Sequence, residues 1–197
     1  MIQRLGIPCI YDVAEVDERV KTGEPPEALV RRLSLEKAQV VAARHPEAIV
    51  IGADTVVVLD GIVLGKPESP EQATQMLKAL RARPHDVLSA VAVVAPHHEP
   101  LQRLCRTTVW MRPYTDEELA AYVASGDPMD KAGAYAIQHS TFRPVERWEG
   151  CYLSVVGLPL ADLVRLLERA GVSVPRSFAD VCEAATGFRC SCAVRMA

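Results

Sequence analysis

The sequence predicts an α/β fold built around one main sheet. Apolar residues recur at intervals of three and four in some segments and form short continuous runs in others. Segments of the two kinds alternate along the chain, which is typical of a sheet with helices packed on it. The length of 197 residues suits one domain, and 49% apolar with 24% charged residues is an ordinary globular balance, so the chain can bury a sizeable core.

The first half of the chain is expected to contain two helices on either side of a hairpin. Residues 24–48 have helical spacing and two prolines that can open the helix. Residues 48–67 predict a strand, a break, and then a hairpin that turns at Asp60 and Gly61. Residues 69–84 predict a second helix, because they start with a serine cap followed by proline.

The second half continues the alternation and ends in an amphipathic helix. The patterns predict strands at residues 85–96 and 101–113, and then a helix with a threonine cap at 114–128. A glycine-rich loop with a hairpin is expected at 130–159, and a last helix at 160–172. We interpret residues 1–174 as one domain and residues 175–197 as a weakly ordered C-terminal tail.

Both ends of the chain have unusual features. The segment before Gly6 has the pattern of a last helical turn, but it is too short for an independent helix, so the chain is expected to start inside an element and to lack its first strand. The tail contains three clustered cysteines, Cys182, Cys190 and Cys192. They lack paired C-x-x-C spacing, so incidental thiols are the favoured interpretation and a metal or redox site is the alternative.

The totals argue against two classes of partner. A net charge of −3 is not that of a protein that binds a nucleic-acid backbone, although a small phosphorylated molecule needs only a few local cations. The sequence has no run of 18 apolar residues and no signal-peptide core at its start, so we expect no membrane span and a cytoplasmic location.

The stretch "AIVIGADTVVVLDGIVLGKP" carries the clearest chemical signal. Asp54 follows an apolar run and the small pair Gly52 and Ala53, where a ligand can approach the backbone. We expect it at the end of a central strand as a metal ligand or general base, and a turn aspartate bound by local amides is the alternative. The hairpin should return Lys66 to the level of Asp54, and the two together suit a metal-bound polyphosphate.

Two further segments contain candidate residues. The segment "DPMDKAGAYAIQ" combines Lys131 with a glycine-rich backbone that can hold phosphate, but a polar surface loop is an equal alternative. Glu36 and Lys37 are adjacent on the first long helix, so they point to different faces of it. They are candidates for the site only if their part of the helix meets Asp54. Standard nucleotide fingerprints and nucleophile motifs are absent, and covalent catalysis is not expected.

Together these segments resemble the Maf family of nucleoside triphosphate pyrophosphatases. The pieces that carry the resemblance are "EVDE", "RLSLEKA", "VIGADTVVVLDGIVLGKP", "YVASGDPMDKAGAYAIQ" and "EGCYLSVVGLPL", in family order over roughly residues 1 to 170. The resemblance implies a two-lobed fold like that of inosine triphosphatases, with a central mixed sheet flanked by helices and a ligand cleft between the lobes. It also implies hydrolysis of a nucleoside triphosphate to the monophosphate and pyrophosphate with a divalent cation, Mg or Mn.

The resemblance also suggests roles for individual residues. It implies catalytic roles for Asp54 and Lys66, metal binding by Asp54 and Glu36, and substrate or phosphate binding by Lys37, Thr55, Lys131 and Gln138. Thr55 and Gln138 look like the branch that takes dTTP and UTP, and an amide such as that of Gln138 can donate and accept toward a pyrimidine edge. A homodimer is left open.

One departure from the family pattern leaves alternatives open. The family starts with a strand and a loop of approximate pattern S-x-S-P-R-R, and this sequence has no such loop. The chain as given is therefore expected to bind triphosphate poorly until it is extended upstream. The alternatives are a non-catalytic regulatory protein linked to cell division, or a pyrophosphatase that prefers 7-methyl-GTP or other modified nucleotides.

Overall fold

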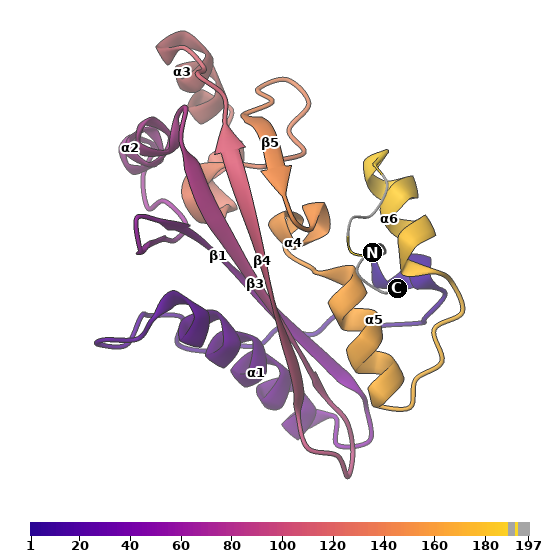
Figure 1. Ribbon diagram of the computed structural model, residues 1–197. Coiled ribbons are helices and arrows are strands. Elements are labelled where there is room, and N and C mark those ends of the chain that lie inside the picture. The colour runs from indigo at the N-terminus through magenta and orange to yellow at the C-terminus, as the bar shows by residue number, and fades with distance from the viewer. Residues whose placement is uncertain (189–191, 193–197) are drawn as a thin grey trace.

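The computed structural model describes residues 1–188 and residue 192, and it confirms the α/β class (Figure 1). The strands are β1 (Val50–Leu59), β2 (Ile62–Leu64), β3 (Pro84–Val94), β4 (Leu101–Met111) and β5 (Val145–Glu149). The α-helices are α1 (Pro26–Arg44), α2 (Pro70–Leu80), α3 (Asp116–Ala124), α4 (Tyr152–Val156), α5 (Leu160–Arg169) and α6 (Phe178–Thr186). Short 3₁₀ helices are η1 (Ile2–Leu5), η2 (Asp127–Asp130) and η3 (Ala132–Ala134). Within this described part of the chain, every helix is too short or too polar to cross a membrane.

The five strands of the described residues form one sheet in the order β2-β1-β3-β4-β5, and all four pairings are antiparallel. The expectation of a mixed sheet was therefore wrong for this part of the chain. A two-residue turn joins β1 to β2, a loop of residues 95–100 joins β3 to β4, and α2 returns the chain so that β3 runs antiparallel to β1. The central strand β3 is buried without interruption from Val87 to Val93, because helices cover both of its faces.

The hairpin between β1 and β2 has the predicted two-residue turn. Asp60 and Gly61 both have positive φ, 52° and 80°, which matches the twist of the flanking strands. The expected break before Asp54 is absent: β1 continues through it, and Asp54 lies opposite Ala90 of β3. Asp54 is therefore inside a strand and not at its end, because β3 supplies a ladder partner for every residue of this stretch.

The two faces of the sheet are covered by different helices, and Figure 1 shows α1 and α5 on opposite sides of the long strands. On one face, α1 packs against Val56, Leu88 and Ala90. The opposite face carries one apolar cluster with α2 and α3 and a second with α5 and α6. The division into two lobes with a cleft between them stays a prediction.

Gly52 sets how closely α1 approaches β1. A Cβ atom at this position would lie 2.2 Å from the backbone oxygen of Ser34 and 2.8 Å from the backbone nitrogen of Ala38. Only a glycine leaves room for the helix backbone at this distance. The contact brings the middle of α1, where Lys37 lies, directly beside the middle of β1.

The helix caps that the sequence predicted are present. The Ser69 hydroxyl accepts from the backbone N–H of Gln72 at 3.2 Å, with proline in the first turn of α2. Thr115 and Glu118 form a reciprocal capping box at the start of α3. These interactions lie within four residues of each other in sequence, which is why pattern alone located them.

Two expectations about the C-terminal half were wrong. Residues 130–159 contain the expected loop at 135–144, but β5 and α4 follow it in place of a local hairpin, and β5 pairs with the distant β4. Residues 178–186 form α6, although a weakly ordered tail was expected from about Pro175. Phe178 and Val181 are buried in the cluster that contains Leu5 of η1, so the helix depends on a partner far away in sequence. The helix end at Gly6, with φ 82°, is confirmed.

We expect Gly52→Ala to lower the free energy of unfolding by about 2–3 kcal/mol, because the new methyl group must push α1 away from β1. Urea denaturation at pH 7 measures this change. The control is Gly65→Ala, where an added Cβ meets no atom within 4 Å. Equal effects of the two substitutions would contradict a special close contact at Gly52.

Candidate active site

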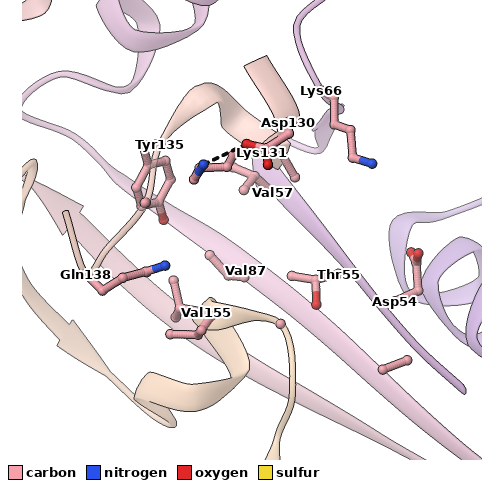
Figure 2. Close-up of a pocket in the computed structure, with 15 residues that line it drawn as sticks. Asp54, Thr55, Val57, Lys66, Val87, Asp130, Lys131, Tyr135, Gln138 and Val155 are labelled. Atoms are coloured by element: carbon pink, nitrogen blue, oxygen red, sulfur yellow. Dashed lines mark hydrogen bonds and ion pairs between the residues drawn. The ribbon is translucent and has the colours of Figure 1, made fainter. Parts of the chain in front are cut away.

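A cavity of about 330 Å³ opens on the sheet face opposite α1, at the boundary between the two apolar clusters. Its volume is in the range of small-molecule sites. Strands β1 and β3, the segment after β2, the segment after η2 and the end of α4 contribute its walls, including Asp54, Thr55, Val57, Lys66, Val87, Lys131, Tyr135, Gln138 and Val155. Figure 2 shows these residues around the cavity, with Asp54 and Lys66 at one end and Tyr135 and Gln138 at the other.

Asp54 and Lys37 form an ion pair between β1 and α1. The Lys37 Nζ lies 2.7 Å from Asp54 Oδ1 and 2.6 Å from Glu18 Oε1, so one ammonium group joins two carboxylates. The Asp54 side chain is 11% exposed and that of Lys37 20% exposed. Within the part of the chain that the structure describes, no hydrogen-bond donor contacts the second oxygen of Asp54, which leaves Oδ2 for a ligand or water.

Burial and charge act in opposite directions on this pair. Burial raises the pKa of Asp54 above its ordinary value, and it outweighs the opposing effect of the Lys37 ammonium. For Lys37, burial lowers the pKa, but hydrogen bonds to Asp54 and Glu18 outweigh it and raise the pKa. Asp54 is therefore a stronger base than an ordinary aspartate and stands beside a lysine that stays charged.

Lys66 and Lys131 come from different segments that one backbone hydrogen bond ties together. The sequence predicts a return of Lys66 to the level of Asp54; the hairpin register pairs Val57 with Leu64, and Lys66 lines the same cavity as Asp54. The Gly133 N–H donates to the carbonyl oxygen of Gly65 at 3.0 Å, which links the residue before Lys66 to the loop of Lys131.

The backbone at Gly133 permits this link. Its φ is 69°, and an added Cβ would lie about 3 Å from the Val57 side chain. The Lys131 Nζ donates to Asp130 Oδ1 at 2.6 Å and to the backbone oxygen of Asp127 at 2.7 Å. The ammonium group is thus fixed by its own loop at the cavity wall (Figure 2).

Thr55 and Gln138 also line the cavity, as expected from the sequence. The Thr55 hydroxyl hydrogen-bonds that of Ser89, a fully buried residue of β3. In Figure 2 the amide of Gln138 points into the end of the cavity that is far from Asp54. The site therefore has Asp54 and Lys66 at one end, called the charged end, and the uncharged amide of Gln138 at the other, called the neutral end, and Figure 2 draws the Lys131 ammonium group on the wall between them, on the side of Tyr135.

The structure does not bring Glu36 into this cavity. Its carboxylate lies 3.0 Å from Arg32 Nη1 and 3.9 Å from Lys21 Nζ, and it is absent from the cavity lining. Glu36 and Lys37 face in different directions, as their adjacency requires, and Lys37 is the one that meets Asp54. Metal binding by Glu36 stays a prediction.

The charged end fits a small divalent cation. Among residues 1–188 and 192, no group of three or more histidine, cysteine or acidic side chains is arranged to hold a metal. Mg²⁺ does not require such a cage, because it commonly binds one or two carboxylates together with water and substrate phosphates. Asp54 supplies an oxygen ligand of that kind at the cavity, and Glu18, which is also absent from the lining, is joined to it through Lys37.

The structure adds residues that the sequence reasoning did not assign. Glu18 lies in residues 7–23, for which no element was predicted, although it ends the "EVDE" piece of the resemblance. Ser89 sits in an apolar strand pattern, and only its pairing opposite Thr55 shows its role. Tyr135 lies inside a segment that was singled out, but its contact with His85 crosses 50 residues.

The described cysteines are absent from the lining of this cavity. Cys182 is buried in α6, and Cys190 lies outside the described residues. Cys192 lines a second cavity together with Cys105 and Cys151. The metal interpretation of the tail finds no supporting cluster among the described residues.

The fold and the cavity together define an α/β protein with a small-molecule site that is lined by a carboxylate and two lysines. The family described as Maf-like protein matches residues 1–170, and the chain belongs to this Maf family.

Curated relatives cover most of the chain. A protein of Thermomicrobium roseum is 48% identical over 186 residues, which is 91% of this chain and 84% of the relative. A protein of Myxococcus xanthus is 46% identical over 175 residues (89% and 88%), and one of Moorella thermoacetica is 46% identical over 175 residues (88% and 90%). Each of the three is named dTTP/UTP pyrophosphatase.

Lys37→Met should lower the free energy of unfolding by about 2 kcal/mol at pH 7, because it leaves the Asp54 carboxylate partly buried without its donor. Urea denaturation gives the value. The control is Lys21→Met, which removes a lysine that is 66% exposed and 3.9 Å from its partner, and it should cost less than 1 kcal/mol.

The loss of free energy of unfolding caused by Lys37→Met should depend on pH. Without Lys37, burial raises the pKa of Asp54 further, so the folded state binds a proton at a pH where the unfolded state does not. The loss is then largest above this raised pKa and shrinks as the pH falls toward 3.8, the ordinary aspartate value. A loss that stayed constant from pH 7 to pH 4 would show that Asp54 is not the group left unpaired.

Proposed function

We propose that this protein is a nucleoside triphosphate pyrophosphatase that hydrolyses dTTP and UTP to the monophosphate and pyrophosphate. The observation that carries the proposal is the convergence of Asp54, Lys66, Lys131 and Gln138 on one cavity. The names of the curated relatives, which are 43–50% identical to this chain, support the same activity.

Asp54 is the proposed catalytic carboxylate. Its raised pKa suits a group that accepts a proton from water, and its free Oδ2 leaves room for that water. Lys37 keeps the carboxylate in place through Oδ1. Water then displaces pyrophosphate from the α-phosphorus: an oxygen–phosphorus bond to water forms, the bond to the bridging oxygen breaks, and no covalent enzyme intermediate is needed.

The lysines are the proposed phosphate-binding groups. Lys66 lies at the same end of the cavity as Asp54, and Lys131 is held at the wall by Asp127 and Asp130. Their ammonium groups would hold the phosphates and stabilise the negative charge that builds up on the leaving pyrophosphate. The Gly65–Gly133 hydrogen bond keeps the spacing of the two segments.

A divalent cation, Mg²⁺ or Mn²⁺, is the proposed cofactor. When bound, it would neutralise phosphate charge and polarise the phosphorus–oxygen bonds. Asp54 is the proposed ligand, with Glu18 as the second carboxylate because both contact Lys37. Glu36 would join them only after leaving Arg32.

The neutral end of the cavity is the proposed base site. Gln138 can donate to a ring carbonyl and accept from the ring N–H of uracil or thymine. Thr55, fixed by Ser89, lies between this end and Asp54 (Figure 2). The proposal includes a role in clearing the cytoplasmic nucleotide pool, with a nucleoside triphosphate as partner rather than a nucleic acid or a membrane, and it leaves a homodimer open.

We predict that Asp54→Asn will reduce pyrophosphate release from UTP by about 10²-fold or more, because it removes the charge of the carboxylate and keeps its shape. The measurement is pyrophosphate release with Mg²⁺ in excess. Asp60→Asn, in the exposed turn of the same hairpin, is the control and should retain the parent rate. Near-full activity of Asp54→Asn would remove Asp54 from the mechanism.

Nucleotide selectivity provides a second test. UTP and dTTP should give higher kcat/KM than GTP, ATP or 7-methyl-GTP, and Gln138→Glu should reduce that preference, because a carboxylate cannot donate to a carbonyl. A panel of these nucleotides with pyrophosphate detection measures both effects. Equal kcat/KM for all of them would contradict the base site, and no hydrolysis of any would contradict the proposed function.

A further inference from the structure

His85 and Tyr135 form a buried pair at the neutral end of the cavity. His85 lies on β3 and is 4% exposed, and its Nε2 is 2.7 Å from the hydroxyl oxygen of Tyr135. The two rings meet edge to face, with centroids 5.4 Å apart. Tyr135 lines the cavity at the end where the amide of Gln138 lies (Figure 2).

The direction of this hydrogen bond follows from the other ring nitrogen. Among the described residues, His85 Nδ1 is the one buried side-chain nitrogen or oxygen without a hydrogen-bond partner. Burial lowers the pKa of His85 to about 4, so the ring is neutral at pH 7 and has a single N–H. An N–H buried without an acceptor is rarely tolerated, so the proton belongs on Nε2, where it is donated to the Tyr135 oxygen.

This arrangement leaves the hydroxyl proton of Tyr135 without an acceptor among the residues that the structure describes. The oxygen already accepts from His85, and within residues 1–188 no other side chain or backbone group accepts from it. We propose that Tyr135 donates this proton in a hydrogen bond to a carbonyl oxygen of the uracil or thymine ring, and that His85 is the positioning residue that fixes the direction of the hydroxyl. The inference rests on the proposed function.

The chemistry of the base fits two donors. Uracil and thymine present two carbonyl oxygens on either side of one ring N–H. The amide of Gln138 can satisfy the N–H and one carbonyl, and Tyr135 supplies a donor for the other. Adenine presents ring nitrogens and an amino group in place of two carbonyl oxygens around one ring N–H, so it does not match this arrangement of donors and acceptors, which disfavours its binding.

The backbone around Tyr135 holds the hydroxyl in place. Ala134, the residue before it, has φ 61°, a conformation that its surroundings must maintain. On the other side, the backbone N–H of Ala136 donates to the Tyr122 hydroxyl at 3.1 Å, and that hydroxyl donates to Asp127 at 2.7 Å. Tyr135 is therefore a fixed donor rather than a mobile one.

The test replaces each carbonyl oxygen of the substrate by sulfur, which is a much weaker acceptor. The two analogues are 2-thio-UTP and 4-thio-UTP, and one of them carries its sulfur opposite Tyr135. We expect kcat/KM of the parent protein to be about tenfold lower for that analogue than for UTP. In Tyr135→Phe this sensitivity should disappear, while any sensitivity due to Gln138 remains. Unchanged sulfur sensitivities in Tyr135→Phe, or none in the parent, would overturn the inference.

His85→Phe tests the positioning role. In the parent protein it should reduce the fall in kcat/KM from UTP to the same thio analogue. In Tyr135→Phe it should not change that ratio further, because His85 acts through Tyr135. Equal effects in both backgrounds would contradict positioning. The control for loss of a buried hydroxyl is Tyr114→Phe, whose hydroxyl donates to the Leu77 carbonyl away from the cavity, and which should keep the parent selectivity.

Binding measurements separate this inference from the proposed function. UTP, 2-thio-UTP and 4-thio-UTP are titrated calorimetrically, with Mg²⁺, into the variants Asp54→Asn and Asp54→Asn/Tyr135→Phe. Tyr135-dependent discrimination in binding without pyrophosphate release by the parent would support the inference and contradict the proposed function. If the parent hydrolyses UTP but its discrimination between UTP and the thio analogues does not depend on Tyr135, the proposed function would be supported and this inference contradicted.

Discussion

The ion pair between Lys37 and Asp54 is the interaction on which the site depends. It joins the middle of α1 to the middle of β1, and it exists because Gly52 lets the helix backbone lie against the strand. The ammonium group offsets part of the cost of burying a carboxylate inside a sheet. Asp54 thereby stays at the cavity with one oxygen bound and the other available.

The rest of the cavity follows from that placement. Asp54 faces α1, whereas Thr55, the next residue, faces the opposite side of the sheet, because successive side chains of a strand alternate. The short strand β2 covers only Val57 to Leu59, so the earlier part of β1 stays open at the edge of the sheet and both residues reach the cavity. A continuous strand can thus supply a charged group and a base-facing group from neighbouring positions.

The sequence predicted the parts of the structure that depend on neighbours in the chain. The turn at Asp60 and Gly61 and the return of Lys66 follow from residues within a dozen positions of each other. The same locality explains the caps of α2 and α3. The conformation of β1 at Asp54 was not predictable in this way, because the ladder with β3 overrides the local tendency of glycine to break a strand.

Contacts between distant segments account for what pattern missed. Glu18 reaches Lys37 from a segment without regular structure, and Tyr135 reaches His85 across 50 residues. The helix α6 was expected to be a tail because its buried apolar residues pack against α5 and η1, and η1 is far away in sequence. In each case the structure depends on where a distant partner lies in space, and that position cannot be read from a single sequence.

The hydrogen bond from Gly133 to Gly65 has a consequence for motion. It fastens the loop of residues 126–139 to the hairpin, while Tyr122 and His85 fasten the same loop to α3 and β3. Opening of the loop must break these attachments together, so the amide of Gly133 should exchange its hydrogen with solvent at the rate of a cooperative local unfolding event and not of a fraying turn. Departure of a product past this loop would then be limited by the lifetime of its closed state.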